Sequence, residues 1–449
     1  MKQASPVEVA EAFLGRIERL NPSLNAIVTV APDLLARARE AEVSLARGEA
    51  AGPLHGVPIT IKDTLETAGL RTTSGSPRRA RFVPESDAPS VALLKAAGAI
   101  ILGKTNPAEM AMDYTADNPI FGVTNNPYDL SRTPGGSSGG EAAAIAACLS
   151  PAGLGTDLAG SIRIPSHFCG IAGLKLTSTR VLGAGQFPPA IGPYSLGAAI
   201  GPMARSIDDL QLLTSVLSNT VAEARSLRDR ESSLQGCRVA WYSDDEVAPV
   251  TDETRGAVRA AARALEEAGL VTEERRPPGV ERGHELWLRL FSRASVVLLR
   301  NVYTGGYEDA GAFVRWRLAN ADKPPPPTLD EYIAAWMERD RLRLDLNAWM
   351  NTTQLLIAPV GATPALPHGT QKVTVNDQII SVFRAFSYSQ AFNVFDLPSV
   401  CVPTGFSSDG LPIGVQVVGR PSAEEDVLRA AAIIERELGG WQPPNLPDF

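Results

Sequence analysis

Short apolar segments alternate with helical segments through residues 51–215, and this alternation is the strongest constraint on the fold. Apolar runs such as Val57–Ile61 and Ala99–Leu102 are typical of buried strands, whereas Ser90–Ala97 and Glu141–Ala147 are typical of helices. Strands that alternate with helices usually build a sheet that the helices cover. We therefore expect an α/β layered fold around a central sheet.

The segment before this region has helical character. Residues 1–50 are rich in Ala, Leu, Arg and Glu, and they predict two helices joined near Asn21-Pro22. Ser5 and Glu8 have the spacing of a capping box, which places the start of the first helix directly after Ser5.

The segment after it changes character twice. Residues 225–350 are more helical and more polar, and Thr328 with Glu331 predicts the start of a long helix. The tryptophans of this region either pack helices together or line a substrate channel; they are Trp287, Trp316, Trp336 and Trp349. Strand character returns near the C-terminus, at Leu355–Pro359, Ser399–Pro403 and Ile413–Gly419.

Composition excludes several classes of function. The chain has a net charge of −8 and no strongly basic stretch, so we expect no nucleic-acid partner. No apolar run is long enough to span a membrane, and the four scattered cysteines favour reduced thiols in a cytoplasmic protein. The histidines lie far apart without an H-E-x-x-H motif, so we expect no metal site.

Two segments rich in glycine and serine, 134–141 and 156–165, are candidates for the catalytic or ligand-binding site. Such segments can cradle a phosphate, but no nucleotide-binding motif is present, so we expect no cofactor. Apolar segments flank both closely, which argues against a flexible linker. Glycine lets backbone N–H groups approach a reacting oxygen, and Ser137, Ser138 and Ser161 are candidate nucleophiles.

A serine nucleophile needs a base, and lysine can serve if it is neutral. Lys62 ends an apolar, strand-like run, where burial would lower its pKa. The alternative is an ordinary surface lysine at the end of a strand. His55 and His167 lie nearest the glycine-rich segments, and each is interpreted as a packed or hydrogen-bonded residue.

Taken together, the motifs resemble the amidase signature family. In order along the chain they are Gly56–Asp63, Gly103–Asn106, Phe121–Pro127, Pro134–Gly140, Gly155–Pro165, Gly173–Lys175, Gly201–Arg205, Ala358-Pro359, Phe392-Asn393, Leu397-Pro398 and Gly410–Gln416. Only residues 225–350 show no such match. The resemblance implies one α/β/α domain over residues 1–449 with a central mixed β-sheet. The tryptophans and the proline run of residues 225–350 indicate that this variable segment is an insertion forming a substrate lid.

The resemblance also implies roles for individual residues. Lys62 is the catalytic base, Ser137 is a bridging serine on a cis peptide bond, and Ser161 is the nucleophile. The oxyanion hole is formed by backbone N–H groups, those of Leu158, Ala159, Gly160 and Ser161. The residues implied to support this network are Ser138 and Arg163. The residues implied to line the acyl pocket are Ala111 and Met112.

This chain departs from the family pattern before the nucleophile, where alanine occupies a position that is usually glycine. If Ala159 needed a positive φ, the substitution would destabilise the loop by roughly 1–2 kcal/mol. A second departure, Leu176 after Gly173–Lys175, is expected to alter a loop and not the chemistry. Glu141 and the segment 118–122 resemble the fatty-acid-amide-hydrolase-like branch, which hints at an apolar acyl substrate.

The expected function is a stand-alone serine hydrolase that cleaves small-molecule amides, and also esters or carbamates, through an acyl-enzyme intermediate. The expected assembly is a monomer or homodimer. The alternative is the A subunit of a tRNA-dependent glutamyl or aspartyl amidotransferase, which acts only within a complex. The same triad would serve both.

Overall fold

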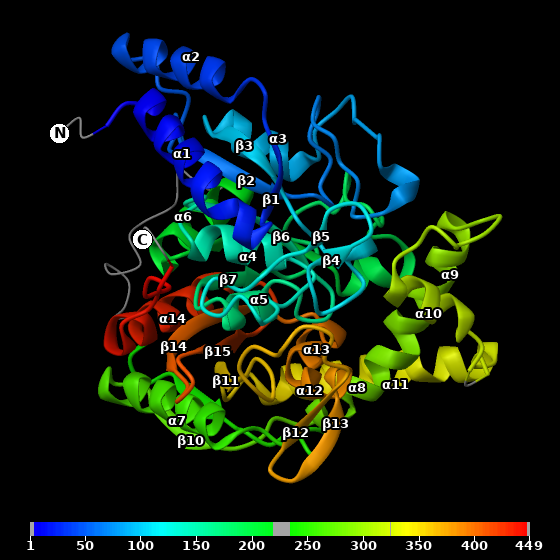
Figure 1. Ribbon diagram of the computed structural model, residues 1–449. Helices are drawn as coiled ribbons and strands as arrows, with labels where there is room; N and C mark the ends of the chain where they lie inside the picture. Colours follow the sequence, from blue (N-terminus) through cyan, green and yellow to red (C-terminus); the bar gives the residue numbers. More distant parts are fainter. Residues whose placement is uncertain (1–3, 219–233, 324, 447–449) are drawn as a thin grey trace.

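A large mixed sheet runs through the molecule with helices on both faces (Figure 1). The computed structural model describes residues 4–218, 234–323 and 325–446. Within them, eleven strands form one sheet in the order β1-β3-β2-β6-β8-β7-β14-β15-β11-β9-β10. Strand β2 is parallel to β3 and β6, whereas β8, β7, β14 and β15 join through antiparallel pairs. The expected α/β fold with a central mixed sheet is confirmed.

The strands of the large sheet are β1 (Ile27–Val30), β2 (Pro58–Lys62), β3 (Ile100–Thr105), β6 (Ala152–Asp157), β7 (Ala172–Lys175), β8 (Ala199–Ala204), β9 (Arg238–Trp241), β10 (Val271–Glu274), β11 (Leu355–Pro359), β14 (Ser399–Phe406) and β15 (Pro412–Gly419). Two hairpins lie outside it, β4 (Asp117–Asn118) with β5 (Gly122–Val123) and β12 (Lys372–Val375) with β13 (Gln378–Ser381).

The helices are α1 (Pro6–Leu24), α2 (Leu34–Ala46), α3 (Pro89–Ala96), α4 (Gly139–Ala146), α5 (Arg163–Phe168), α6 (Ile207–Leu217), α7 (Asp252–Glu267), α8 (Gly283–Trp287), α9 (Arg293–Val302), α10 (Ala312–Ala319), α11 (Leu329–Trp349), α12 (Val382–Ala385), α13 (Ser387–Val394) and α14 (Glu424–Leu438). A π-helical segment, η7 (Leu288–Ser292), joins α8 to α9.

The alternation of side chains along the central strands divides the core in two. In β14, Val400 and Val402 join the cluster that includes α7 and α14, whereas Cys401 joins the cluster that includes α13. Successive residues of a strand point to opposite faces, so each face of the sheet has its own apolar layer. Helix α5, which follows the second glycine-rich segment, packs on β7, β14 and β15.

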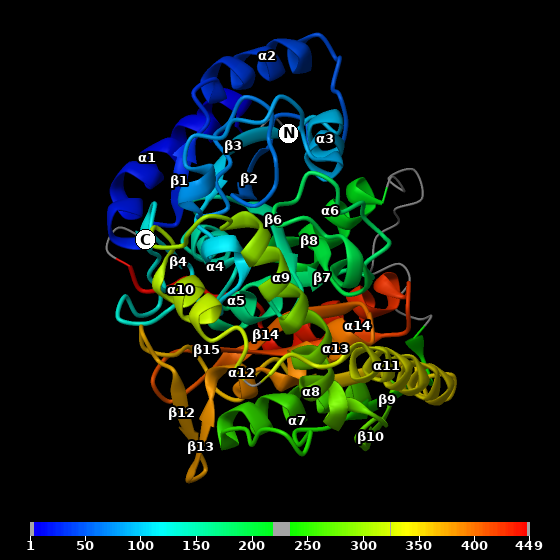
Figure 2. The same cartoon turned by 90° about the vertical axis from the view of Figure 1, so that its right-hand side faces the viewer.

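Helices α9 and α10 project from one side of the molecule, at the right in Figure 1 and toward the viewer in Figure 2. They belong to the expected insertion 225–350, of which residues 225–233 lie outside the described residues. The capping box at Thr328 and Glu331 is present and opens α11. None of the described helices is both long and apolar enough to cross a lipid bilayer.

The predicted junction between two helices at Asn21-Pro22 is wrong. Helix α1 continues past it and ends at Asn25, whose left-handed conformation (φ 52°) lets its N–H donate to Asn21 O at 2.7 Å. The side chain of Asn21 accepts hydrogen bonds from the N–H groups of Ala26 and Ile27, which begin β1. A turn organised by asparagine therefore stands where a proline break was expected, and β1 was not predicted.

A pair of glycine substitutions tests the tight packing of the central strands. A Cβ on Gly201 of β8 would lie 2.0 Å from Leu174 O, whereas one on Gly256 of α7 would meet no atom within 4 Å. We expect Gly201→Ala to lower the free energy of unfolding by about 1–3 kcal/mol through overpacking. The matched control Gly256→Ala should raise it by roughly 0.5–1 kcal/mol. Urea denaturation measures both, and equal effects would contradict the close packing of β8 on β7.

Candidate active site

Lys62 and Ser137 form the closest contact among the predicted catalytic residues. Lys62 ends β2 and is fully buried, and its Nζ donates to Ser137 Oγ at 2.8 Å and to Thr156 Oγ1 at 2.8 Å. Burial lowers the pKa of Lys62 to about 7, although the carboxylates of Asp157 and Glu141 act to raise it. The lysine at the end of this strand is thus internal, not a surface residue, and its amine is poised to exchange a proton with Ser137.

Ser137 lies just before α4, and the peptide bond between Gly136 and Ser137 is cis, as expected. Ser161 lies in the loop between β6 and α5. Both serines line one small cavity of about 50 Å³, together with Thr156. The structure therefore brings the two serines of the predicted triad to the same space, with Lys62 bonded to Ser137.

Ser138 holds the two glycine-rich segments together. Its backbone N–H donates to Ser161 O at 3.2 Å, and its hydroxyl donates to Thr156 O at 3.3 Å. These bonds tie the segment that carries Ser137 to the loop that carries Ser161. The position agrees with the supporting role expected for Ser138.

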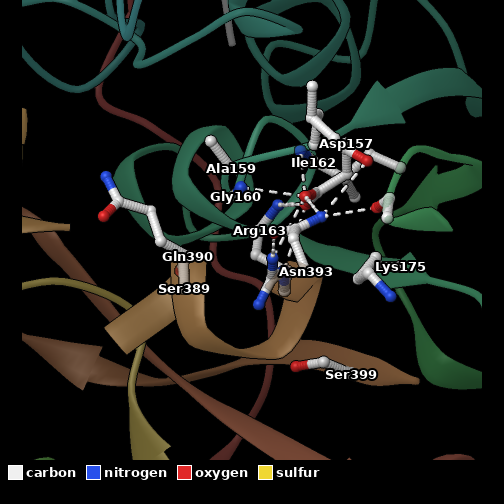
Figure 3. A network of polar contacts seen from close by, with 12 residues as sticks. Asp157, Ala159, Gly160, Ile162, Arg163, Lys175, Ser389, Gln390, Asn393 and Ser399 are labelled. Atoms are coloured by element: carbon white, nitrogen blue, oxygen red, sulfur yellow. Dashed lines mark hydrogen bonds and ion pairs between the residues drawn. The ribbon is translucent and has the colours of Figure 1, made fainter. Parts of the chain in front are cut away.

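A buried ion pair shapes the loop that carries Ser161 (Figure 3). Arg163 donates to Asp157 through Nε at 3.1 Å and Nη2 at 3.0 Å, and both side chains are completely buried. Asp157 also accepts hydrogen bonds from the N–H groups of Gly160 (2.8 Å) and Ile162 (3.1 Å) and from Asn393 Nδ2 (2.9 Å). Burial alone would raise the pKa of Asp157, but the Arg163 charge and these hydrogen bonds hold it far below its usual range.

The geometry separates the four N–H groups expected in the oxyanion hole into one that is bonded, that of Gly160, and three without a hydrogen-bond partner among the described residues, those of Leu158, Ala159 and Ser161. Gly160 has φ 105°, and a Cβ there would lie 2.6 Å from Ile164 Cδ1, so glycine is required. Its N–H is directed to Asp157 and is not free. Ala159 has no positive φ, so the alanine in place of the usual glycine introduces no backbone strain.

Carbonyl contacts fix the same loop from its outer side. Tyr114 Oη donates to Ala159 O at 3.0 Å, and Trp287 Nε1 donates to Leu158 O at 3.0 Å. Both donors belong to the wall of a larger cavity that also reaches Ser161. The loop is therefore held on one side by the buried ion pair and on the other by aromatic side chains.

Three polar residues near Lys62 were not predicted from the sequence as part of the site. Thr156 and Asp157 lie inside the second glycine-rich segment, yet no role was expected for them. Glu141 is fully buried, accepts a hydrogen bond from Thr105 Oγ1 at 2.7 Å and another from Thr60 Oγ1, and adds negative charge near Lys62. The signal for Glu141 was its position directly after the glycines of the first glycine-rich segment.

A cavity of about 320 Å³ opens from Ser161 on the side of α8 and α10. Its wall includes Ala111 and Met112, the residues expected in the acyl pocket, and both also line the small cavity. The aromatic residues of the wall are Tyr114, Tyr194, Trp287, Phe291, Phe313, Trp316 and Phe383. Of the four tryptophans, Trp287 and Trp316 therefore line the cavity, whereas Trp336 packs edge-on against Phe291.

The histidines bond to other groups. His55 Nε2 lies 2.9 Å from Ala41 O, and His167 Nε2 lies 3.0 Å from Thr363 O while its Nδ1 accepts from Gly414 N at 2.8 Å. Both agree with their interpretation as hydrogen-bonded residues. In the described ranges, no three His, Cys, Asp or Glu side chains gather as a set of metal ligands.

Comparisons with known proteins agree with this arrangement. Residues 8–428 match the Amidase family. The chain is 34% identical to the A subunit of glutamyl-tRNA(Gln) amidotransferase from Carboxydothermus hydrogenoformans, over 97% of this chain and 94% of that protein. It is 31% identical to fatty-acid amide hydrolase 2-A of Danio rerio, over 99% of this chain and 88% of that protein.

Solved structures show the same likeness. A crystal structure of an amidase superposes with a TM-score of 0.86 and 29% identity, covering 97% of each chain. The range that matches the family, residues 8–428, contains Lys62, Ser137 and Ser161. The chain is therefore a member of the amidase signature family and an amidase, an enzyme that cleaves carbon–nitrogen bonds other than peptide bonds.

Proposed function

We propose that this chain is a stand-alone amidase in which Ser161 is the nucleophile, Ser137 relays protons and Lys62 is the base. The observation that supports it most is the buried Lys62 Nζ, 2.8 Å from Ser137 Oγ, with Ser137 and Ser161 on one small cavity. A neutral amine in this place can accept a proton. Amides are the principal substrates, and esters and carbamates pass through similar tetrahedral species.

Acylation begins when Ser161 Oγ attacks the substrate carbonyl carbon. The Ser161 proton passes to Ser137 Oγ, and the Ser137 proton passes to Lys62 Nζ. The carbonyl oxygen becomes an oxyanion beside the free N–H groups of Ala159 and Ser161, with Leu158 at the edge of the same loop. Donors fixed in place before the reaction stabilise this charge without reorganising.

Collapse of the tetrahedral species breaks the C–N bond. An amine anion is a very poor leaving group, so the nitrogen takes back the proton from Lys62 through Ser137 as the bond breaks. Water then attacks the acyl-enzyme along the same route and releases the acid. Ser138 and Arg163 take no proton in this scheme; they hold the two segments in register.

We propose that the described part of residues 225–350 is a lid within a single domain 1–449. Helices α8 and α10 contribute Trp287, Phe313 and Trp316 to the larger cavity. The lid is attached to the acyl-pocket loop by Glu109, which accepts from Tyr303 Oη at 2.5 Å and from Gly311 N at 2.7 Å. These two bonds join α9 and α10 to the segment that carries Ala111 and Met112.

A second candidate is the A subunit of a tRNA-dependent amidotransferase, and the likeness to such a protein over almost the whole chain favours it. The same triad would then release ammonia for a partner protein. The two candidates differ in what the isolated chain does. A free amidase turns over a simple amide alone, whereas an amidotransferase component depends on its complex.

The nucleophile is tested on the purified chain with an aryl amide. We expect the parent to turn over alone and Ser161→Ala to lose at least about 1,000-fold in kcat while keeping the parent's circular dichroism, because only a hydroxyl is removed. A fluorophosphonate should label Ser161, as read by peptide mass spectrometry, and the control Ser138→Ala should still be labelled there. A label on Ser138 would overturn the assignment, and an inactive parent would favour the amidotransferase candidate.

The protonation state of Lys62 predicts the pH profile. Only the neutral amine accepts the proton, and burial places the pKa of Lys62 at about 7. The kcat/KM for an amide should therefore rise about tenfold per pH unit below this value and level off above it. Initial rates over the range in which circular dichroism stays constant measure this. A profile that falls with pH across neutrality would exclude Lys62 as the base.

Lys62 also has to return a proton to the leaving group, so its loss should affect amide and ester substrates to different extents. Lys62→Ala should damage hydrolysis of an amide more than that of an ester with the same acyl group, because an alkoxide leaves with less help. The matched control is Lys104→Met, since Lys104 is equally buried but bonds to Leu65 O and Thr67 Oγ1 and not to Ser137. Its amide and ester rates should fall together. If amide and ester hydrolysis lose rate equally in Lys62→Ala, Lys62 does not protonate the leaving group and acts only as a base or as a structural support.

A further inference from the structure

A second cavity of about 580 Å³ adjoins the cavity that opens from Ser161. The two share three wall residues, Leu288, Ser292 and Arg317, which belong to η7 and α10. The space beyond this shared wall lies between η7 and the start of α11. The proposed reaction uses none of the side chains that line it.

The wall of the second cavity carries more cations than carboxylates. Its charged residues are Glu285, Arg289, Arg293, Arg317, Lys323 and Glu331. Arg289 is paired with Glu285 at 2.6 Å, and Arg293 lies 3.9 Å from Asp322. Glu331 accepts hydrogen bonds from Thr328 in its capping box. The carboxylates near this cavity are thus already engaged by other groups.

Arg317 is the cation at the junction of the two cavities. Its Nη2 donates to Ser292 O at 2.7 Å and also to Ser292 Oγ, but no carboxylate among the described residues pairs with it. Burial lowers the pKa of Arg317, and the charge of Arg293 acts in the same direction. A guanidinium has five N–H donors, so several remain for a ligand. Arg317 is half-buried, and a guanidinium without a carboxylate partner can bind an anionic group of a ligand.

The rest of the larger cavity is suited to an apolar body. Phe313 stacks on Phe383 with ring centroids 6.0 Å apart and an angle of 15° between their planes, and Trp287 lies 6.1 Å from Phe383. Ser161 lines the same cavity as these rings and Arg317. One ligand can therefore contact the nucleophile, the aromatic wall and the guanidinium together.

We propose that the substrate is an amide whose larger, acyl part has an apolar or aromatic body and ends in an anionic group, a carboxylate, bound by Arg317. This rests on the proposed function, because it assigns a substrate class to that site. The small cavity that Ser161 also lines has a volume of about 50 Å³, which leaves room only for a small group there. The larger part of the substrate therefore occupies the cavity that contains Arg317.

The other titratable groups of the larger cavity are already bonded. Asp113 accepts hydrogen bonds from Tyr114 N at 2.7 Å and Thr115 Oγ1 at 3.1 Å, and burial raises the pKa of its carboxyl group. His284 Nδ1 lies 2.6 Å from Gln390 Oε1, and burial lowers its pKa, so the ring is neutral at pH 7. Among the titratable side chains that line this cavity, Arg317 is the cation for which the described residues supply no carboxylate partner.

Three matched 4-nitroanilides test this proposal. Their acyl part is a phenylpropionyl group that carries a carboxylate, a carboxamide or an aminomethyl cation at the para position. The parent should prefer the carboxylate over the carboxamide in kcat/KM by about tenfold or more, the range for a hydrogen bond to a charged group. Arg317→Met should remove that preference, measured as the ratio of kcat/KM for the carboxylate to kcat/KM for the carboxamide, and Arg317→Lys should restore part of it.

The control is Arg315→Met, on the same helix but exposed and bonded to Glu308 O, which should leave the preference unchanged. If the parent hydrolyses the carboxamide without preferring the carboxylate, or prefers the cation, the proposal is overturned while the amidase function stands. If it hydrolyses none of the three but turns over a simple aryl amide, the proposed substrate class is overturned; if it turns over neither, the proposed function fails instead. Should Arg317→Met not fold, the parent's preference and the Arg317→Lys ratio still decide.

Discussion

The buried pair of Asp157 and Arg163 is the interaction on which the rest of the site depends. Neither side chain is exposed, and taking two charges out of water is unfavourable unless hydrogen bonds replace the lost solvent. Such hydrogen bonds are present here. Backbone N–H groups in the loop of Ser161 donate to Asp157, while Gln416 and Asn393 accept from Arg163. The pair thus joins β6, the loop of Ser161, α13 and β15 (Figure 3). A buried ion pair often adds little to the net free energy of unfolding, so we attribute to this pair the role of fixing the loop.

The negative charge of Asp157 also affects the pKa of Lys62. Asp157 follows Thr156, which accepts a hydrogen bond from Lys62, so its negative charge lies close to the lysine and favours the ammonium form. Glu141 acts in the same direction from α4. Burial opposes both and prevails, which places the pKa of Lys62 near neutrality. A site with less negative charge would hold the lysine neutral at lower pH, but the neutral amine would then be a weaker base toward the serine proton.

The sequence predicted those parts of the molecule that local pattern controls. The strand ending at Lys62, the capping boxes at Ser5 and Thr328, and the segments containing Ser137 and Ser161 were all located. A local sequence pattern does not show which residues distant along the chain bond to one another. Strand β1 was missed because the Asn21 turn that begins it looks like a proline break. The oxyanion hole was predicted as four equivalent N–H groups, yet Asp157 takes that of Gly160.

The segments of residues 225–350 that line the larger cavity show why the substrate is harder to predict from the sequence than the candidate catalytic residues. The catalytic core is held by contacts within the sheet and its glycine-rich segments, where glycines permit backbone approaches that a Cβ would block. The larger cavity is instead built by α8, η7 and α10, which meet that core through a few side-chain bonds such as those of Glu109 and Trp287. Side chains on these helices can change without altering the positions of Lys62, Ser137 or Ser161. Several side chains of the larger cavity thus come from a region in which the sequence shows no family motif, and only the three-dimensional arrangement reveals that Trp287, Phe313 and Arg317 line one cavity.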